Sequence, residues 1–365
     1  MTDTLRYRAS PTNMCLAKHL LGRTHNLELS LVKAIQMSET GQADVLRLVE
    51  LPDPQPGPGE VLVRVEAAGV NFMDIYRRKG LPFDIPTPLP FVPGGELAGT
   101  IVALGDGVEN LNVGDRVFGQ AGPLANGGYA ELVAANAAGL FPIPPGMDAE
   151  SAAGLSVVAV SAAILLTGAA RLSAGETVFV PAAAGGLGSY AVQIAKALGA
   201  TVIAGAGTPE KRRIAIELGA DHAVDYRAPG WTDEIKQLTG GRGVDVALEM
   251  TGPGHVAETL SVLAPFGRLI GYGYVAEQDH AIDSAALMKS LFNPAPGHEL
   301  IGFNVGYWYS GRPQASAAAA ARVMGWLADG TLTGPQVTTF PLADAADAHT
   351  RLERGATIGK VVLIP

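Results

Sequence analysis

The stretch Thr177–Lys211, TVFVPAAAGGLGSYAVQIAKALGATVIAGAGTPEK, determines the fold that we expect for the whole chain. It opens with a short, β-branched apolar run, which predicts a buried strand. A turn of small residues follows, and apolar residues then recur at helical spacing until Gly199, which is typical of a helix end. A second apolar run at 201–204 completes a strand–turn–helix–strand unit.

The small-residue turn holds the candidate phosphate-binding residues. Glycines let the backbone approach a pyrophosphate closely, and the N-terminus of the next helix offers unpaired N–H groups and a positive dipole end. An ordinary glycine-rich turn is the alternative, but the position between a strand and a helix favours dinucleotide binding. The residues assigned to the cofactor here are Ala184, Gly185, Gly186, Leu187 and Gly188.

The end of the second strand predicts which dinucleotide binds. In NAD sites an acidic side chain about 20 residues beyond the turn accepts hydrogen bonds from the ribose. Here Gly207 leaves room for a phosphate instead, while Thr208 and Lys211 offer a hydroxyl and a cation. Tyr226 is expected to close over the same group, and the alternative is that Lys211 and Arg212 only solvate a helix start. The missing acid favours NADPH over NADH.

Length, composition and charge limit which kinds of protein this chain can be. A chain of 365 residues, 48% hydrophobic and only 17% charged, can bury a large core and should form two domains or one domain with an insertion. The net charge of −9 argues against a nucleic-acid surface. The single cysteine, Cys15, excludes a disulfide framework and a thiolate zinc cluster, and it suits a reducing compartment. We therefore expect a cytoplasmic protein.

One uncharged stretch, Ser151–Ala170, is long enough to cross a bilayer. However, it contains as much Ser, Gly and Ala as Leu and Ile, and no basic cluster or aromatic belt flanks it. Buried helices beside a nucleotide site have the same composition. We prefer that interpretation and expect no membrane partner.

The strand pattern along the chain predicts two domains. Short strands separated by glycine turns between 32 and 119 indicate a partly closed β domain. Alternating strands and helices beyond 177 predict a doubly wound parallel sheet, and the tail returns to the first domain. We expect an N-terminal extension (1–31), a catalytic domain formed by 32–155 and 305–365, and a nucleotide-binding domain at 156–304.

Five motifs resemble the medium-chain dehydrogenase/reductase superfamily, and within it the zinc-independent, zeta-crystallin-like quinone oxidoreductases. In chain order they are Asn71–Gly80, Pro93–Gly99, Gly114–Val117, Gly127–Glu131 and Ala182–Gly188. The similarity extends from about Val32 to Pro365. The resemblance implies an α/β protein with a GroES-like catalytic domain and a Rossmann nucleotide-binding domain.

The resemblance also predicts chemistry without a metal. Zinc-dependent relatives carry cysteine and histidine ligands at the motif positions of Asn71 and Gly95, and neither of these residues suits zinc. The expected reaction is hydride donation from NADPH to an electron-poor acceptor, a quinone or an α,β-unsaturated carbonyl. An enoyl-thioester or 2-alkenal reductase, and a non-catalytic NADPH-binding sensor, are the alternatives.

The resemblance further implies the remaining site residues. It places Asn71 and Tyr76 beside the nicotinamide, where the Tyr76 hydroxyl either binds the acceptor carbonyl or packs against the β domain. Ser161 is expected at the carboxamide. The residues expected to wall the cofactor channel are Tyr272, Gly273, Tyr274, Phe303 and Asn304. Family members often dimerise edge to edge, and the strand Glu299–Phe303 is the candidate for that contact.

Overall fold

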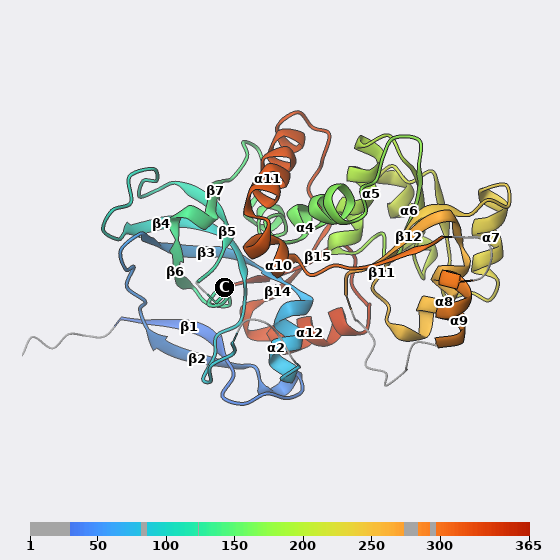
Figure 1. The fold of residues 1–365 in the computed structure, drawn as a ribbon. Coiled ribbons are helices and arrows are strands. Elements are labelled where there is room, and N and C mark those ends of the chain that lie inside the picture. Colours follow the sequence, from blue (N-terminus) through green and yellow to red (C-terminus); the bar gives the residue numbers. More distant parts are fainter. Residues whose placement is uncertain (1–29, 82–85, 123, 274–283, 293–296) are drawn as a thin grey trace, which may run out of the picture.

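Two large sheets lie side by side in the computed structural model (Figure 1). The structure describes residues 30–81, 86–122, 124–273, 284–292 and 297–365. Tyr274 and residues 1–29 of the expected N-terminal extension lie outside the described residues. None of the helices in the described ranges is long and apolar enough to cross a membrane.

The first sheet, on the right in Figure 1, is parallel throughout and has the strand order β10-β9-β8-β11-β12-β13. The strands are β8 (Thr177–Val180), β9 (Thr201–Gly205), β10 (His222–Val224), β11 (Val244–Glu249), β12 (Leu263–Gly271) and β13 (Glu299–Gly302). The chain starts at β8, builds outward to β10, and then returns to add β11 on the other side of β8. The predicted doubly wound sheet is therefore confirmed.

Helices connect these strands. They are α5 (Gly186–Ala197), α6 (Pro209–Glu217), α7 (Trp231–Leu238), α8 (Pro253–Ser261) and α9 (Ser284–Phe292). The sequence analysis did not name α7, an eight-residue helix that buries Trp231 and Ile235, which lie one turn apart on the same face. Helix α8 ends at Ser261, and Leu263 already belongs to β12, which contains a register shift against β11.

The second sheet has seven strands: six follow the order β14-β15-β3-β4-β5-β7, and β6 pairs antiparallel with the first part of β3, Glu60–Arg64. The strands are β3 (Glu60–Val70), β4 (Glu96–Leu104), β5 (Arg116–Gln120), β6 (Leu132–Asn136), β7 (Leu140–Pro142), β14 (Val337–Pro341) and β15 (Lys360–Ile364). Strands β1 (Leu31–Gln36) and β2 (Arg47–Pro52) form a separate hairpin sheet. Strand β15, near the end of the described chain, pairs antiparallel with β3 of this sheet.

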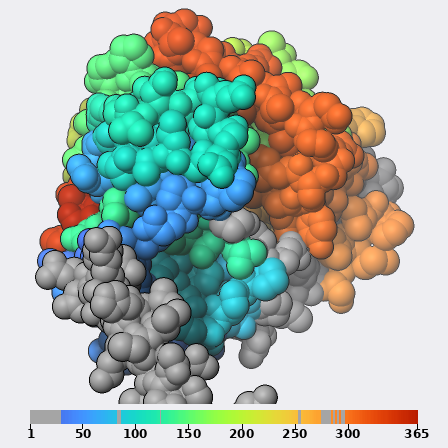
Figure 2. All heavy atoms as spheres, turned by 90° about the vertical axis from the view of Figure 1, so that its left-hand side faces the viewer, coloured from blue at the N-terminus to red at the C-terminus, as the bar shows by residue number. Residues whose placement is uncertain are grey.

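Further helices and short helical turns pack around the seven-stranded sheet and at its junction with the parallel sheet. They are η2 (Ala43–Val45), α2 (Phe72–Lys79), η3 (Ala137–Gly139), α3 (Ala149–Ala152), α4 (Val158–Ile164), a π-helical segment η4 (Leu165–Ala169), α10 (Val305–Gly311), α11 (Pro313–Ala328), η5 (Leu342–Asp344) and α12 (Ala345–Glu353). Figure 2 shows α10 and α11, in orange, directly beside the cyan residues of the β domain. There Phe118 and Phe141 line a small cavity together with Val323 and Leu327 of α11.

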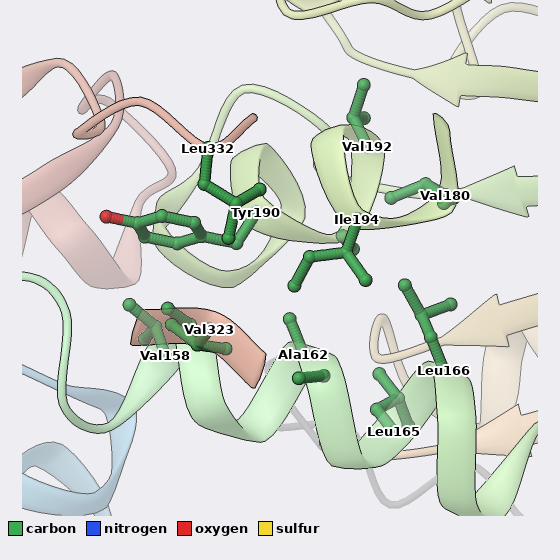
Figure 3. Close-up of a cluster of buried hydrophobic side chains, with 14 of the residues drawn as sticks. Val158, Ala162, Leu165, Leu166, Val180, Tyr190, Val192, Ile194, Val323 and Leu332 are labelled. Carbon is green, nitrogen blue, oxygen red and sulfur yellow. The ribbon is translucent and has the colours of Figure 1, made fainter. Parts of the chain in front are cut away.

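The uncharged stretch forms α3, α4 and η4, and most of it is buried. Figure 3 shows Ala162 of α4 pointing toward Ile194 of α5. One apolar core contains both helices and Val323 of α11. The interpretation as buried helices is confirmed, while the domain boundaries at 155/156 and 304/305 stay predictions.

Candidate functional site

The predicted cofactor residues lie at one edge of the parallel sheet. The carboxyl ends of parallel strands meet at the same edge, and in doubly wound folds ligands bind there, where the strand order reverses. The glycine turn follows β8, which lies at that reversal. The other residues follow neighbouring strands: Gly207 and Thr208 after β9, Tyr226 after β10, Tyr272 and Gly273 after β12, and Phe303 and Asn304 after β13.

The glycine turn is too tight for larger side chains. The Gly185 N–H donates to the Ala182 carbonyl at 2.8 Å, and a Cβ at Gly188 would lie only 2.2 Å from the same oxygen. Gly185 is the N-cap of α5, so no side chain caps this helix. The first N–H groups of α5 are consequently available to an anion such as a pyrophosphate.

The end of β9 presents cations rather than an acid. The Thr208 hydroxyl oxygen accepts the Lys211 N–H at 3.2 Å and caps α6. The Lys211 ammonium donates to the Gly355 carbonyl at 2.7 Å. A Cβ at Gly207 would lie 2.3 Å from the Arg227 Nε, so the guanidinium lies across the position where NAD sites carry their acid.

Arg227 is a cofactor candidate that the sequence analysis missed. The Lys211 ammonium binds the Gly355 carbonyl, and a Cβ at Gly355 would lie 3.7 Å from Arg227 Nη2, so the two cations lie beside the same residue. Burial and, second, the Arg227 charge lower the pKa of Lys211. Arg212, in contrast, is paired with Asp225 at 2.8 Å and does not share this role. The parallel register of β9 and β10 brings Arg227 to Gly207, and its only signal in the sequence was its position next to Tyr226.

Aromatic residues surround the same edge. A Cβ at Gly205 would lie 3.1 Å from Tyr226 Cδ1, so this ring lies over the end of β9. Burial, followed by the Glu249 charge, raises the pKa of the Tyr272 hydroxyl. The Phe303 and Trp308 rings pack with centroids 6.2 Å apart. The Asn304 side chain accepts the Gly306 N–H at 2.9 Å, which gives it a helix-capping role at α10.

The Asn71 carboxamide lies in a buried polar cluster between the two sheets. Its Nδ2 donates to Glu96 Oε2 at 3.1 Å, and its Oδ1 accepts from Lys360 Nζ at 2.6 Å. Lys360 and Glu96 form an ion pair at 2.9 Å, and both side chains are almost fully buried. The other Glu96 oxygen accepts from Ser156 Oγ and from the Val157 N–H, at the start of α4. Sequence analysis missed Glu96 and Lys360 as members of this site.

Tyr76 and Ser161 lie on the two helices that border this cluster. Tyr76 is half-buried on α2, with its ring against Phe72 at 6.2 Å between centroids. Ser161 is buried on α4, within hydrogen-bonding reach of the Tyr309 hydroxyl. Burial raises the pKa of Tyr309 to about 12, so its hydroxyl stays protonated at neutral pH. The catalytic role of Tyr76 and the carboxamide role of Ser161 stay predictions.

A second buried hydrogen-bond network, formed by Asp74, Tyr129 and His349, lies at the start of α2. Asp74 accepts the Asn71 N–H at 2.9 Å, the Gly94 N–H at 3.2 Å and the Tyr129 hydroxyl at 3.2 Å. The Tyr129 oxygen also lies 3.0 Å from His349 Nε2. Burial raises the pKa of Asp74 to about 6, whereas burial and the Arg78 charge lower the pKa of His349 to about 3. This network fixes the backbone that carries Asn71.

The two positions that correspond to zinc ligands are occupied differently here. The Asn71 carboxamide already has both partners described above, and a Cβ at Gly95 would lie 2.7 Å from Met73 Cε. Within the described residues, no group of three or more His, Cys, Asp or Glu side chains could hold a metal ion.

Comparison with known families supports both halves of the fold. The family model "Zinc-binding dehydrogenase" matches residues 186–308, and "Alcohol dehydrogenase GroES-like domain" matches residues 57–145. These matches agree with the parallel sheet and with the β-rich domain, and so confirm the expected pairing of a Rossmann domain with a GroES-like domain.

Individual relatives cover nearly the whole chain. A quinone oxidoreductase of Pseudomonas aeruginosa is 35% identical over 338 residues, which are 92% of this chain and 100% of the relative. A 2-haloacrylate reductase of Burkholderia sp is 32% identical over 341 residues, 92% of this chain and 99% of the relative. The structure of Escherichia coli quinone oxidoreductase complexed with NADPH has a TM-score of 0.81 and 29% identity, covering 91% of this chain and all of that one.

The buried network predicts a specific pH dependence of stability. His349 has its pKa lowered from 6.5 to about 3, so the folded state binds fewer protons than the unfolded state and stability is lost as the pH falls below 6.5. Asp74 has its pKa raised from 3.8 to about 6, so its ionisation destabilises the folded state as the pH rises through that window.

We therefore expect opposite effects from two variants. Between pH 6.5 and pH 4, the melting temperature of His349→Gln should fall less than that of the wild type. The melting temperature of Asp74→Asn should fall more. Thermal unfolding followed by circular dichroism in buffers of equal ionic strength measures both. Parallel curves for the wild type and His349→Gln would contradict the assignment.

Proposed function

Because the chain belongs to the zeta-crystallin-like quinone oxidoreductases of the medium-chain dehydrogenase/reductase superfamily, we propose that it transfers a hydride from NADPH to a quinone or a related α,β-unsaturated carbonyl, without zinc. The proposal rests chiefly on the arrangement of residues at the edge of the parallel sheet. There an uncapped helix N-terminus follows a glycine turn, and the neighbouring strand ends in two converging cations.

The residues at this edge fit NADPH. The α5 N–H groups and the close backbone approach at Gly188 suit a pyrophosphate. Lys211 and Arg227 suit the dianionic 2′-phosphate, which NADH lacks. The bound cofactor supplies the hydride. The protein orients it and excludes water from the reacting carbon atoms.

On the acceptor side, the protein has hydrogen-bond donors rather than a metal. As an acceptor takes up a hydride, negative charge develops on its carbonyl oxygen, and a positioned donor stabilises that charge. Asn71 and Tyr76 are the residues that we propose for this task. Zinc independence is supported by the donor set: a committed carboxamide and a glycine occupy the two ligand positions.

A second candidate function shares the fold and the cofactor. The relative from Burkholderia is a 2-haloacrylate reductase, so a conjugated carboxyl or thioester is a reasonable acceptor class for this chain as well. A protein that binds NADPH without turning over any electrophile, as a sensor would, is the third alternative.

The test is NADPH oxidation, followed at 340 nm, against a panel of quinones, 2-alkenals and enoyl thioesters. We expect quinones or simple enones to give the highest kcat/KM, with NADH as donor at least about tenfold less effective because it lacks the phosphate. A clear preference for alkenals or thioesters would favour the second function. Tight NADPH binding with no oxidation by any acceptor would favour the third.

The cations at the end of β9 generate a separate prediction. Lys211→Met and Arg227→Met should each weaken NADPH binding by about tenfold or more, since charge-assisted hydrogen bonds to phosphate contribute roughly 1.5–3 kcal/mol. Thr208→Ala should act in the same direction. NADH affinity should change little. Arg213→Met is the matched control, because Arg213 lies on the same helix and pairs with Glu217 instead. Fluorescence titrations measure all affinities; equal losses for NADPH and NADH would refute the phosphate assignment.

We also propose a cytoplasmic homodimer with neither nucleic-acid nor membrane partners. The single cysteine suits a reducing compartment, and the net charge of −9 disfavours nucleic acid. Among the described strands β13 pairs with β12 alone, and Leu300 on it is 37% exposed, so the outer edge is open to a second copy.

Light scattering should give about twice the 37.6 kDa chain mass, and Leu300→Lys should shift the protein toward monomer. A monomeric wild type at micromolar concentration would contradict the dimer.

A further inference from the structure

The Asn71 side chain is held at both ends by opposite charges. Its oxygen lies 2.6 Å from the Lys360 ammonium, and its nitrogen lies 3.1 Å from the Glu96 carboxylate. A flipped amide would direct its oxygen at the carboxylate and its NH₂ group at the ammonium. Both contacts would be repulsive, and burial of the pair strengthens the penalty because few water molecules screen it. The ion pair therefore fixes the orientation of the carboxamide.

The fixed orientation determines what Asn71 can offer to a ligand. The amide nitrogen carries two hydrogens, and Glu96 takes one of them. The amide oxygen is engaged by the ammonium at a short distance. Asn71 is 7% exposed, so only a small part of the side chain remains for another partner. The second N–H is the group left to bind a ligand, and Asn71 is therefore a donor rather than an acceptor.

The same ion pair is tied to the glycine turn. Gly359, directly before Lys360, donates its N–H to the Ala184 carbonyl at 2.7 Å. The aliphatic part of the Lys360 side chain packs closely against three glycines from separate segments. Added Cβ atoms at Gly154, Gly69 and Gly186 would lie 2.9, 3.1 and 3.5 Å from Lys360 side-chain carbons. The Lys360 side chain is thus held between the turn that we assign to the pyrophosphate and the backbone at Gly69 and Gly154.

We propose that Lys360 and Glu96 are positioning residues that make the Asn71 carboxamide a hydrogen-bond donor to the carbonyl oxygen of the hydride acceptor. The proposal rests on the proposed function. In the reaction of an enone, the β-carbon gains the hydride, the C=C electron pair shifts to leave an enolate oxygen, and the nicotinamide is oxidised. Solvent then supplies the proton that neutralises the product. The Asn71 N–H stabilises the enolate oxygen while its charge develops.

Two variants separate positioning from folding. Asn71→Leu removes the donor and leaves the Lys360–Glu96 pair intact. The double variant Glu96→Gln/Lys360→Met removes both charges together, which avoids a buried unpaired ion. In it, the oxygen of the new amide can still accept from Ser156 and Val157, while its NH₂ group faces Asn71 and favours the inverted carboxamide. Glu66→Gln/Arg116→Met, at an exposed ion pair of the β domain, is the matched control.

The experiment is single-turnover hydride transfer, measured by stopped flow after NADPH is bound at saturation. We expect the rate constant to fall about 10²–10³-fold in Asn71→Leu and at least about tenfold in the Glu96/Lys360 double variant, with NADPH affinity and the control unchanged. The loss should grow as quinones become less electron-poor, because a weaker electrophile depends more on the donor. A purely structural role would not produce that trend.

Each outcome decides the proposal. Wild-type rates in a folded double variant, or a loss confined to NADPH affinity, would overturn it while leaving the proposed function intact. Inertness of the wild type toward every acceptor would instead refute the proposed function, and this inference with it. If the double variant does not fold, Asn71→Leu decides alone: a wild-type rate constant, or a loss that is equal for all quinones, overturns the proposal.

Discussion

The contact on which the rest of the structure depends is the buried ion pair between Lys360 and Glu96. It joins the first residue of β15 to the first residue of β4, and the same carboxylate binds the backbone that leads into α4. A buried pair of this kind is costly to desolvate and tolerates the loss of one partner poorly. Here it fixes the Asn71 amide, the start of α4 and the glycine turn relative to one another. The proposed acceptor site at Asn71 and the proposed pyrophosphate site at the turn therefore depend on the same ion pair.

Electrostatics also divide the parallel-sheet edge into two regions. At the β8 turn, backbone N–H groups and a helix dipole provide partial positive charge. At the end of β9, Lys211 and Arg227 provide full charges, and Arg212 is neutralised by Asp225. Because the formal net charge of the chain is −9, these cations stand out locally against an acidic background. Local charge rather than overall charge therefore favours a phosphorylated cofactor.

Sequence reasoning recovered the elements whose signal is local. The β8–α5–β9 unit could be read directly, because its strands are short apolar runs and its turn is made of glycine and alanine. Helix α7 was not named, although Trp231 and Ile235 lie one turn apart on its buried face, because the helix has only eight residues. The site divides in the same way: Gly185–Gly188 follow from a contiguous motif, whereas Glu96, Arg227 and Lys360 acquire their roles through strand pairings between distant segments.

Strand β15 lies inside the seven-stranded sheet, between β14 and β3, although it is the last element of the chain. Its pairing of Val361 with Val70 is strongly non-local, as is the neighbouring contact of Lys360 with Asn71, 289 positions apart. During synthesis the parallel sheet can form as soon as β13 emerges, but β3 lacks this neighbour until β15 has been synthesised as well. The same strand carries Lys360, so completion of the seven-stranded sheet and closure of the buried Lys360–Glu96–Asn71 cluster occur in one step.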